Sequence, residues 1–488
     1  MRIKKIAASL FSLGMVASPL AFATNGMNLE GYGPIAEAMG GASMAYDNGV
    51  AAVMNNPATL GLMQDGASRF GGGVGLLAPN IKTSMPGASV KSDATAFYMP
   101  AAGYAHKSGQ WAYGVAVFSQ GGMGTEYSAT SFMAAGSGEK VRSEVGVGRF
   151  IVPLVYQPDD KVTVGGSVDF VWAGMDLKMA LPGMMAQGKG SFQDMVASFG
   201  GTQEFGSASG NLVSTLQAGF APGGACGASA CLSSVNWARV DFSNSSAFTG
   251  QAKGTGFAFK LGATYKVDSQ LTLGATFHSK TSLGDLTSSS ASMSMNLTGV
   301  ALTAMGGTAT VPVTGSVSIH NFQWPQTIAM GAAYQVNDQL QLLADYKRIG
   351  WKDVMKDFSL TFTADATQAN PVASNFQMGG KSVDMSLFQN WDDQNVIELG
   401  GAYKTNEQLT LRAGVNLANN PVPNKYMNPL FPAIAKNHLT LGAGYAFNKE
   451  STLDFSYVYV PTVTATNGAG ITVDFAGYSA QLVYAYSF

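Results

Sequence analysis

Charged residues are scarce in this chain, and their scarcity argues against an ordinary soluble protein. Lys, Arg, Asp and Glu together make up 12% of the 488 residues, about half of the usual share. The formal net charge is -2, so the chain lacks the excess of positive charge that a nucleic-acid partner requires. Low charge combined with 60 glycines and 10% aromatic residues is typical of a β-barrel whose outer wall faces lipid.

Histidine and cysteine are also rare, which argues against an enzyme or a metal site. The four histidines are His106, His278, His320 and His438. None lies in a recognisable Ser/His or Asp/His arrangement, so we expect no enzyme. Cys226 and Cys231 stand five residues apart in a glycine-rich stretch of an exported chain, which predicts a small loop disulfide. A metal site is disfavoured because no other cysteine or histidine is near, and we expect no metal and no cofactor.

Long apolar runs are missing after residue 23, so no transmembrane helix is expected there. The first 23 residues have a positive start at Arg2, an apolar core over 6–16 and a small-residue end at Ala23. This pattern predicts a signal peptide over 1–23, cleaved to leave Thr24 as the mature N-terminus. A membrane-anchoring helix is the weaker alternative, because the apolar run is short and interrupted.

After residue 66 the chain consists of short runs that alternate apolar and polar residues, the period of half-buried strands. The segments 264–277, 333–346 and 402–415 each contain two such runs around a tight polar turn, which indicates hairpins. Short and long connections alternate along the whole series. We therefore predict a 14-stranded antiparallel transmembrane β-barrel over residues 66–488, with its longest extracellular loop at about 180–252. The predicted strands are 67–78, 94–105, 111–119, 144–157, 162–178, 254–267, 271–284, 312–335, 339–351, 394–404, 408–418, 438–447, 451–461 and 477–488.

The last strand alternates aromatic residues and ends at Phe488. Such an end looks like the signal that outer-membrane assembly machinery reads. We therefore expect a protein of the outer membrane of a Gram-negative bacterium, in contact with outer-membrane lipid and lipopolysaccharide. We also expect it to be a monomer.

The stretch 24–65 does not follow the period of the strands. It contains short Ala- and Met-rich pieces broken by glycines, and it closes with Asn55-Asn56-Pro57-Ala58. Because Asn before Pro favours a turn over a helix, we predict that 24–65 is a compact non-β domain, called the hatch below, that lies against or inside the barrel. Alternation places Arg149 and Lys347 on the lumenal side of the wall. These cations either pair with acidic groups of the wall and hatch, or meet the anionic head group of a ligand.

These features resemble the FadL family, the long-chain fatty acid and hydrocarbon transporters of Gram-negative outer membranes. The resemblance covers essentially the whole mature chain. It rests on AMGGASMAYDNGVAAVMNNPATL (38–60), WPQTIAMGAAY (324–334), LRAGVNLANNPVPNKYMNPLFPA (411–433) and the terminal aromatic strand. It implies a barrel closed by an N-terminal hatch, with Asn56, Pro57 and Ala58 as part of the gate.

The family mechanism also implies a path for the ligand. Hydrophobic ligand is captured by extracellular loops, passes to a pocket near the mature N-terminus, and leaves sideways through an inward kink of the third strand. Gly121, Gly122 and Gly124 suit such a kink, since glycine clusters weaken strand pairing. They could equally begin an extracellular loop.

Two groups of apolar residues are candidate ligand contacts. Near the mature N-terminus, Met27, Leu29 and Tyr32 could line the pocket, with core packing of the hatch as the alternative. In the long loop, Phe192 and Phe199 could line the outer groove, or could pack a helix against the barrel. The resemblance implies passive uptake of hydrophobic molecules, with long-chain fatty acids as the first candidate and aromatic or aliphatic hydrocarbons as the alternative. A general diffusion porin is more distant, because a hatch of some forty residues would block its lumen.

Overall fold

The structure is a computed structural model that describes residues 24–182, 205–220, 230–246 and 250–488. The predicted signal peptide over 1–23 and parts of the predicted loop 180–252 lie outside the described residues, together with Phe192, Phe199 and Cys226. The division into signal peptide, hatch and barrel stays a prediction.

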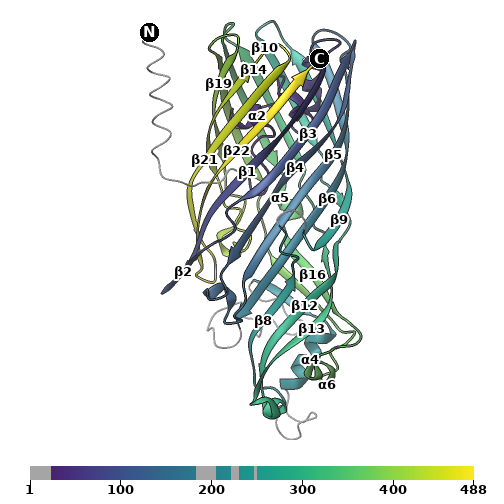
Figure 1. Ribbon diagram of the computed structural model, residues 1–488, viewed down its shortest axis with the longest axis vertical. Helices are drawn as coiled ribbons and strands as arrows, with labels where there is room; N and C mark the ends of the chain where they lie inside the picture. Colours follow the sequence, from purple (N-terminus) through teal and green to yellow (C-terminus); the bar gives the residue numbers. More distant parts are fainter. Residues whose placement is uncertain (1–23, 183–204, 221–229, 247–249) are drawn as a thin grey trace.

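The described strands form one antiparallel sheet that curls into an elongated, closed barrel (Figure 1). β22 pairs with β1 over sixteen residue pairs and so closes the sheet. In their order around the barrel the strands are β1 (Ser68–Met85), β3 (Phe97–Ser108), β4 (Trp111–Tyr127), β5 (Val141–Tyr156), β6 (Val162–Pro182), β9 (Ala252–Lys266), β10 (Leu271–His278), β14 (Thr327–Gln335), β15 (Leu340–Ile349), β18 (Gln394–Lys404), β19 (Leu409–Ala418), β20 (Asn437–Ala446), β21 (Ser451–Thr466) and β22 (Thr472–Ser487).

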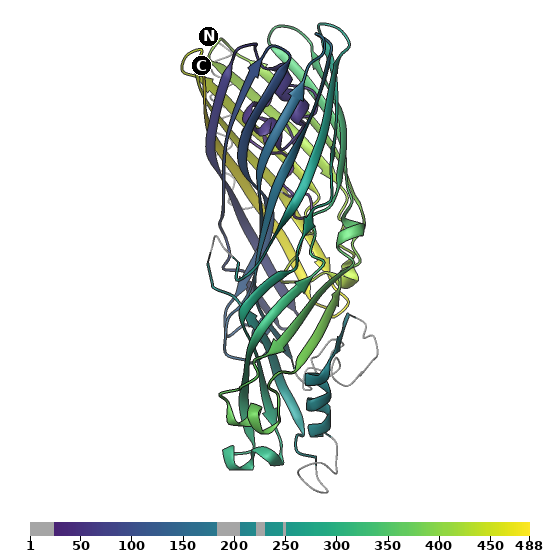
Figure 2. The same cartoon turned by 90° about the vertical axis from the view of Figure 1, so that its right-hand side faces the viewer.

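Further strands extend this sheet beyond the barrel wall, at the end opposite the tight turns (Figure 2). Beginning from β6, the pairing runs through β8, β12, β13, β16, β17 and β7. The additional strands are β2 (Ala88–Lys91), β7 (Gly206–Ser209), β8 (Ser234–Phe242), β11 (Ser282–Leu283), β12 (Leu286–Thr298), β13 (Thr308–His320), β16 (Asp357–Ala364) and β17 (Ser382–Phe388).

Fourteen strands close the wall, but eight more belong to the same sheet, so the prediction of a 14-stranded barrel is wrong for this sheet, which holds twenty-two strands among the described residues. The segments 271–284 and 312–335, each predicted as one strand, both contain two. β12 was missed because its outward residues are small and polar. Its inward residues Met293, Met295 and Leu297 are fully buried, so it is half-buried but faces no lipid on its outer side.

The helical elements are short and lie in the hatch and in the connections between strands. No helix among the described residues has the length and apolar character needed to cross a membrane. The elements are α2 (Pro34–Glu37), α4 (Asn211–Phe220), α5 (Trp351–Val354), α6 (Pro371–Asn375), η1 (Gly49–Val53), η2 (Pro57–Leu62), η3 (Phe132–Ala134), η4 (Val300–Met305) and η5 (Asn424–Tyr426).

Five tight turns at one end of the barrel share one side-chain arrangement. Asp159, Asp268, Asn337, Asn406 and Asn448 each accept hydrogen bonds from the amides two and three residues later. An Asx side chain that bonds its own backbone in this way nucleates a turn. This arrangement explains why the hairpins repeat the same polar pattern in the sequence.

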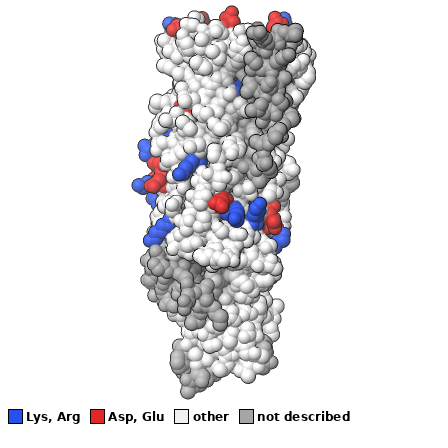
Figure 3. Space-filling model, turned by 90° about the vertical axis from the view of Figure 1, so that its left-hand side faces the viewer, with Lys and Arg blue, Asp and Glu red and all other residues white. Residues whose placement is uncertain are grey.

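The outer wall is apolar between two bands of charge. Along β5 the outward residues Phe150, Val152 and Leu154 are 41–56% exposed, whereas the inward Val145 and Val147 are 3% exposed. Figure 3 shows Lys, Arg, Asp and Glu gathered mainly at the turn end and in a second band where the barrel meets its extension. The apolar zone between the bands is the surface expected to contact lipid.

The hatch fills the lumen at the turn end of the barrel (Figures 1 and 2). It approaches the wall closely because glycines of the wall leave room for its backbone. A Cβ on Gly274 would overlap the carbonyl of Met44, and one on Gly414 would overlap the backbone of Met39. Hatch and wall therefore fit together only with glycine at these positions.

Candidate functional site

A gap in the barrel wall separates the extension-side halves of β3 and β4. These strands pair from Ala101–Phe118 to Ser108–Trp111. Beyond this region, residues 97–100 of β3 pair with β1, residues 119–127 of β4 pair with β5, and the two segments do not pair with each other. Contacts resume at the far end of the gap, where the Asp93 amide donates to the Glu126 carbonyl at 2.7 Å. The gap is thus a window in the sheet with hydrogen bonds above and below it.

The cause of the gap is a β-bulge in β4. The register between β4 and β5 shifts between Ser119 and Gly121, so Gln120 is left without a partner. A bulge bends its strand and re-aims the side chains around it. Gly121, Gly122 and Gly124 all follow the bulge and line the gap. Their predicted role as the third-strand kink stays a prediction, but they lie where the strand departs from its neighbour.

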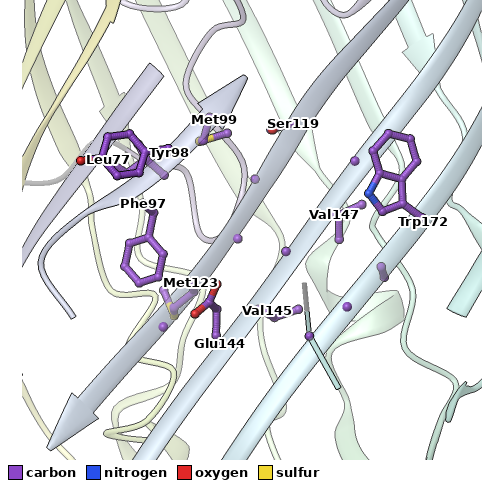
Figure 4. Close-up of a pocket in the computed structure, with 18 of the residues that line it drawn as sticks. Leu77, Phe97, Tyr98, Met99, Ser119, Met123, Glu144, Val145, Val147 and Trp172 are labelled. Carbon is purple, nitrogen blue, oxygen red and sulfur yellow. The ribbon is translucent and has the colours of Figure 1, made fainter. Parts of the chain in front are cut away.

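A cavity of about 510 Å³ occupies the gap. Figure 4 shows side chains from both edges of the gap around it, including Phe97 and Met99 of β3 and Met123 of β4. Its lining includes inward-facing residues such as Val147 and outward-facing ones such as Trp172, so residues of both faces of the wall line the cavity. A volume of this size suits a small organic ligand. Thr24, the predicted mature N-terminus, also lines it.

The first residues of the hatch hold the bulge in place. The Tyr32 hydroxyl donates to the Gln120 carbonyl at 2.8 Å, and Arg149 Nε donates to Gln120 Oε1 at 2.5 Å. The backbone of Asn28 forms a bridge with Gly121. Hatch and gap are therefore connected, because a displacement of residues 28–32 would remove the contacts of Tyr32 and Asn28 with β4.

Asn28 also connects the hatch to a group of tryptophans. Trp324 Nε1 donates to Asn28 Oδ1. Trp324 lies edge-on to Trp351, which lies edge-on to Trp391, with ring centroids 5.8 and 5.2 Å apart. The hatch backbone at Gly26 packs directly on Trp351, where a Cβ would approach to 2.8 Å. These rings form an aromatic wall beside the first residues of the hatch.

The predicted pocket residues are brought close together but do not share one cavity. Met27 lines a second, smaller cavity of about 30 Å³ that also contacts Trp391 and Phe322. Leu29 is 5% exposed and belongs to the buried core. Tyr32 bonds to the bulge as described above. Their roles in ligand binding remain predictions.

The lumenal cations are paired with carboxylates. Arg149 Nη1 lies 2.7 Å from Asp169 Oδ2, and Lys260 binds the same oxygen. Lys347 Nζ lies 2.6 Å from Glu398 Oε1 and also donates to the Glu30 carbonyl at 2.8 Å. The further pairs are Arg412–Asp454 at 2.8 Å and Arg69–Asp47 at 2.7 Å. Arg149 and Lys347 thus pair with carboxylates of the wall, which is the first of the two alternatives given above, and Lys347 also binds the hatch.

Glu30 carries a buried carboxyl that forms no ion pair with the described residues. It is fully buried, and neither of its side-chain oxygens has a hydrogen-bond partner among the described residues. Burial raises the pKa of Glu30 well above its ordinary value, and the nearby Glu37 carboxyl raises it further. Glu37 itself accepts hydrogen bonds from Ser456 and Ser479 of the wall. Burial and the Glu37 carboxyl thus both disfavour the charged form of Glu30.

The Asn56-Pro57-Ala58 turn contacts the wall at β9 and β6. The Asn56 side chain accepts from the Ala58 amide at 3.1 Å and donates to the Met44 carbonyl at 2.7 Å and the Ala263 carbonyl at 3.3 Å. Asn56 thus caps η2 and joins two parts of the hatch to β9. Whether this turn acts as a gate stays a prediction.

Asn28, Gln120 and Trp324 hold the hatch against the gap and were not predicted from the sequence. WPQTIAMGAAY begins at Trp324, so the tryptophan was visible as part of a motif, but its partner was not.

Cys231 is disulfide-bonded, while Cys226 lies outside the described residues, so their pairing stays a prediction. Among the described residues, no group of three or more His, Cys, Asp or Glu side chains could hold a metal ion.

Comparisons with known proteins agree with this architecture. The family model for outer membrane protein transport proteins (OMPP1/FadL/TodX) matches residues 11–473. The crystal structure of the toluene transporter TodX of P. putida is 29% identical with a TM-score of 0.76, covering 94% of this chain and 99% of that one. The toluene transporter TbuX of Ralstonia pickettii has the same identity and coverage, with a TM-score of 0.71.

One curated relative is an uncharacterised protein from the 5′ region of the phosphoenolpyruvate carboxykinase gene of Chlorobium limicola. It is 52% identical over 97 residues, which are 20% of this chain and 48% of that protein. The chain thus spans about half the length of this curated relative.

Proposed function

Because the chain belongs to the OMPP1/FadL/TodX family of outer membrane transport proteins, we propose that it takes up hydrophobic molecules and releases them sideways into the membrane through the gap between β3 and β4. The gap is the observation that carries this proposal. A continuous barrel wall would hold an apolar solute in the lumen, whereas the cavity of about 510 Å³ in the gap, lined by residues of both faces of the wall, offers it a way toward the lipid.

The charges in the lumen favour a neutral hydrocarbon over a long-chain fatty acid. Arg149 and Lys260 share Asp169, and Lys347 is bound to Glu398. A ligand carboxylate would have to replace one of these partners, and breaking a buried ion pair costs about 3–5 kcal/mol. The toluene transporters named above are similar over nearly the whole chain. Neutral aromatic or aliphatic hydrocarbons are therefore the first candidate, and long-chain fatty acids are the second.

The release step needs no energy source. Moving an apolar molecule from water to hydrocarbon returns about 0.8 kcal/mol per buried CH₂ group. A hydrocarbon in the cavity gains by entering the membrane and gains nothing by entering aqueous periplasm. Transport is passive in this proposal, and the hatch moves only far enough to let ligand reach the gap.

A bulky label at the edge of the gap tests the route. Ser119→Cys places a thiol on the outer side of β4 at the gap, and Val117→Cys places one two residues away on the same face, where β3 and β4 are paired. Cys231 is disulfide-bonded and does not compete for the label. Both variants are expressed in cells that lack other members of the family and are treated with a bulky maleimide.

Entry of radiolabelled toluene into the cells is then measured at low concentration. We expect the label to reduce entry through the Ser119→Cys variant by at least fivefold and to leave entry through the Val117→Cys variant unchanged. Equal entry through both labelled variants would show that the ligand does not leave through the gap. Oleate is measured in parallel, and entry of oleate without toluene would reverse the order of the two substrate classes.

A general diffusion porin is tested by a different measurement. The hatch occupies the lumen, so planar bilayers containing the protein should show no large, steady conductance. A large open pore would contradict both the proposed route and the proposed substrates.

A further inference from the structure

The cavity in the gap has a carboxylate on its lining, at Glu144 of β5. Among the described residues that line the cavity, Glu144 alone is acidic. Figure 4 shows its side chain beside Met123 of β4. The register partner of Glu144 is Gly124, two residues before Glu126, whose carbonyl takes part in closing the far end of the gap. Glu144 therefore lies near the end of the gap that faces the extension.

Glu144 belongs to the outer face of the wall. In the same strand, Val145 and Val147 are buried on the lumenal side, whereas Phe150 is exposed on the outer side. Because successive side chains of a strand point to opposite faces, Glu144 shares the outer face with Phe150. A molecule that leaves the lumen through the gap thus meets Glu144 at the outer mouth.

The absence of a side chain on Gly124 brings Glu144 close to the far edge of the gap. A Cβ on Gly124 would lie 3.1 Å from Cζ of Phe97 and 3.2 Å from Cα of Glu144. Phe97 belongs to β3, so these two residues flank one backbone position from the two sides of β4. The outer mouth is therefore bordered by an aromatic ring on one side and a carboxylate on the other.

The negative charge of Glu144 is only partly balanced by its neighbours. Arg142 binds both Glu144 and Glu126, the second at 2.9 Å. Its Nε atom also lies 3.9 Å from Asp176, so one guanidinium is shared by three carboxylates. Lys140 pairs with Glu126 at 2.6 Å. Three carboxylates thus face two cations, and the group keeps a net negative charge beside the cavity.

Two further lysines lie in this region and do not remove that charge. Lys178 is the register partner of Arg142 on one side and of Asp241 on the other, so its charge is offset by that carboxylate. Lys253 also lines the cavity. The register places it two strands and two residues away from Glu144, which corresponds to about 12 Å between their Cα atoms.

We infer that Glu144 is a charge filter at the outer mouth of the gap, which lets neutral hydrophobic molecules pass and slows those that carry a carboxylate. The inference rests on the proposed exit through the gap. Repulsion between like charges is stronger beside an apolar cavity than in water, because the effective dielectric constant is lower there. A neutral molecule carries no charge on which Glu144 can act. Glu144 is thus a specificity-determining residue.

Oleate and oleyl alcohol test the filter, because they share one hydrocarbon chain and differ in the head group. Entry of each radiolabelled compound is measured in cells that lack other members of the family, at pH 8, which is above the ordinary range of carboxyl pKa values. Glu144→Gln removes the charge and keeps the size, whereas Glu144→Asp keeps the charge. Glu126→Gln is the matched control, because Glu126 also binds Arg142 but does not line the cavity. Heat-dependent gel mobility verifies that each variant is folded.

We expect Glu144→Gln to raise oleate entry by about fivefold or more over the wild type and to leave entry of oleyl alcohol unchanged. Glu144→Asp and Glu126→Gln should behave like the wild type. The inference is overturned if Glu144→Gln leaves oleate entry unchanged, if entry of both compounds rises together, or if either of the other variants raises oleate entry as strongly. The proposed exit fails on a different result, which is equal entry of toluene through the two labelled cysteine variants, so the two failures can be told apart.

Discussion

Replacing Tyr32 with phenylalanine removes the hydrogen bond that joins the hatch to the bulge in β4. The Tyr32 hydroxyl donates to the Gln120 carbonyl at 2.8 Å, and Gln120 is the residue that the register between β4 and β5 skips. Its carbonyl therefore depends on Tyr32 rather than on the neighbouring strand. A buried acceptor that loses its donor costs about 1–3 kcal/mol. We expect the local opening of the bulge to become about 5- to 150-fold more frequent.

Hydrogen exchange measures this opening directly. Amides of residues 119–124 are followed by mass spectrometry in wild type, Tyr32→Phe and Tyr46→Phe. Tyr46→Phe is the matched control, because the Tyr46 hydroxyl donates at 3.0 Å to Ala42 within the hatch and not to the wall. Exchange over residues 119–124 should rise in Tyr32→Phe and stay at the wild-type rate in Tyr46→Phe. If both variants behave alike, the hatch does not hold the bulge through this bond, and the coupling of hatch to gap is refuted.

Three further changes test the packing of the hatch and lumen. Burial raises the pKa of Glu30 above its ordinary 4.5, so the free energy of unfolding should fall as pH rises from 4.5 through the raised pKa. Glu30→Gln should flatten this pH dependence in urea unfolding, and a pH dependence equal to that of the wild type would contradict the argument. Asp169→Asn leaves Arg149 without its carboxylate and should cost about 3–5 kcal/mol, seen as a lower denaturation midpoint. Gly262→Ala would drive a Cβ into Asn56 Oδ1, so proteolysis of the hatch should accelerate; equal cleavage rates would show that the turn tolerates displacement.

Much of the barrel can be predicted from local pattern. Alternation along each strand determines which residues face lipid, because an unpaired charge on the lipid face would cost about 2–4 kcal/mol near the membrane centre. The inward positions expected for Arg149 and Lys347 agree with the structure, where both bind carboxylates. The hairpins were visible through Asx turns such as Asp268, whose hydrogen bonds are local.

The strand prediction failed beyond the membrane, where the outward residues of a strand are polar and not apolar. A strand in the membrane exposes large apolar residues, whereas β12 lies beyond the lipid and exposes serine. Its buried residues Met293 and Met295 have the correct period, but without apolar residues on the other face the segment looks like a loop. Local composition therefore reveals strands that face lipid more readily than strands that lie outside the membrane.

By itself, the sequence determined the β-barrel class, the family, the inward and outward faces of the strands and the presence of a non-β segment inside them. Each of these follows from neighbouring residues or from a motif. Only the tertiary structure decided the gap and the hatch contacts of Gln120. The physical reason is that pairing register joins residues far apart in the chain. A bulge such as the one at Gln120 cannot be recognised until the register with the neighbouring strand is known.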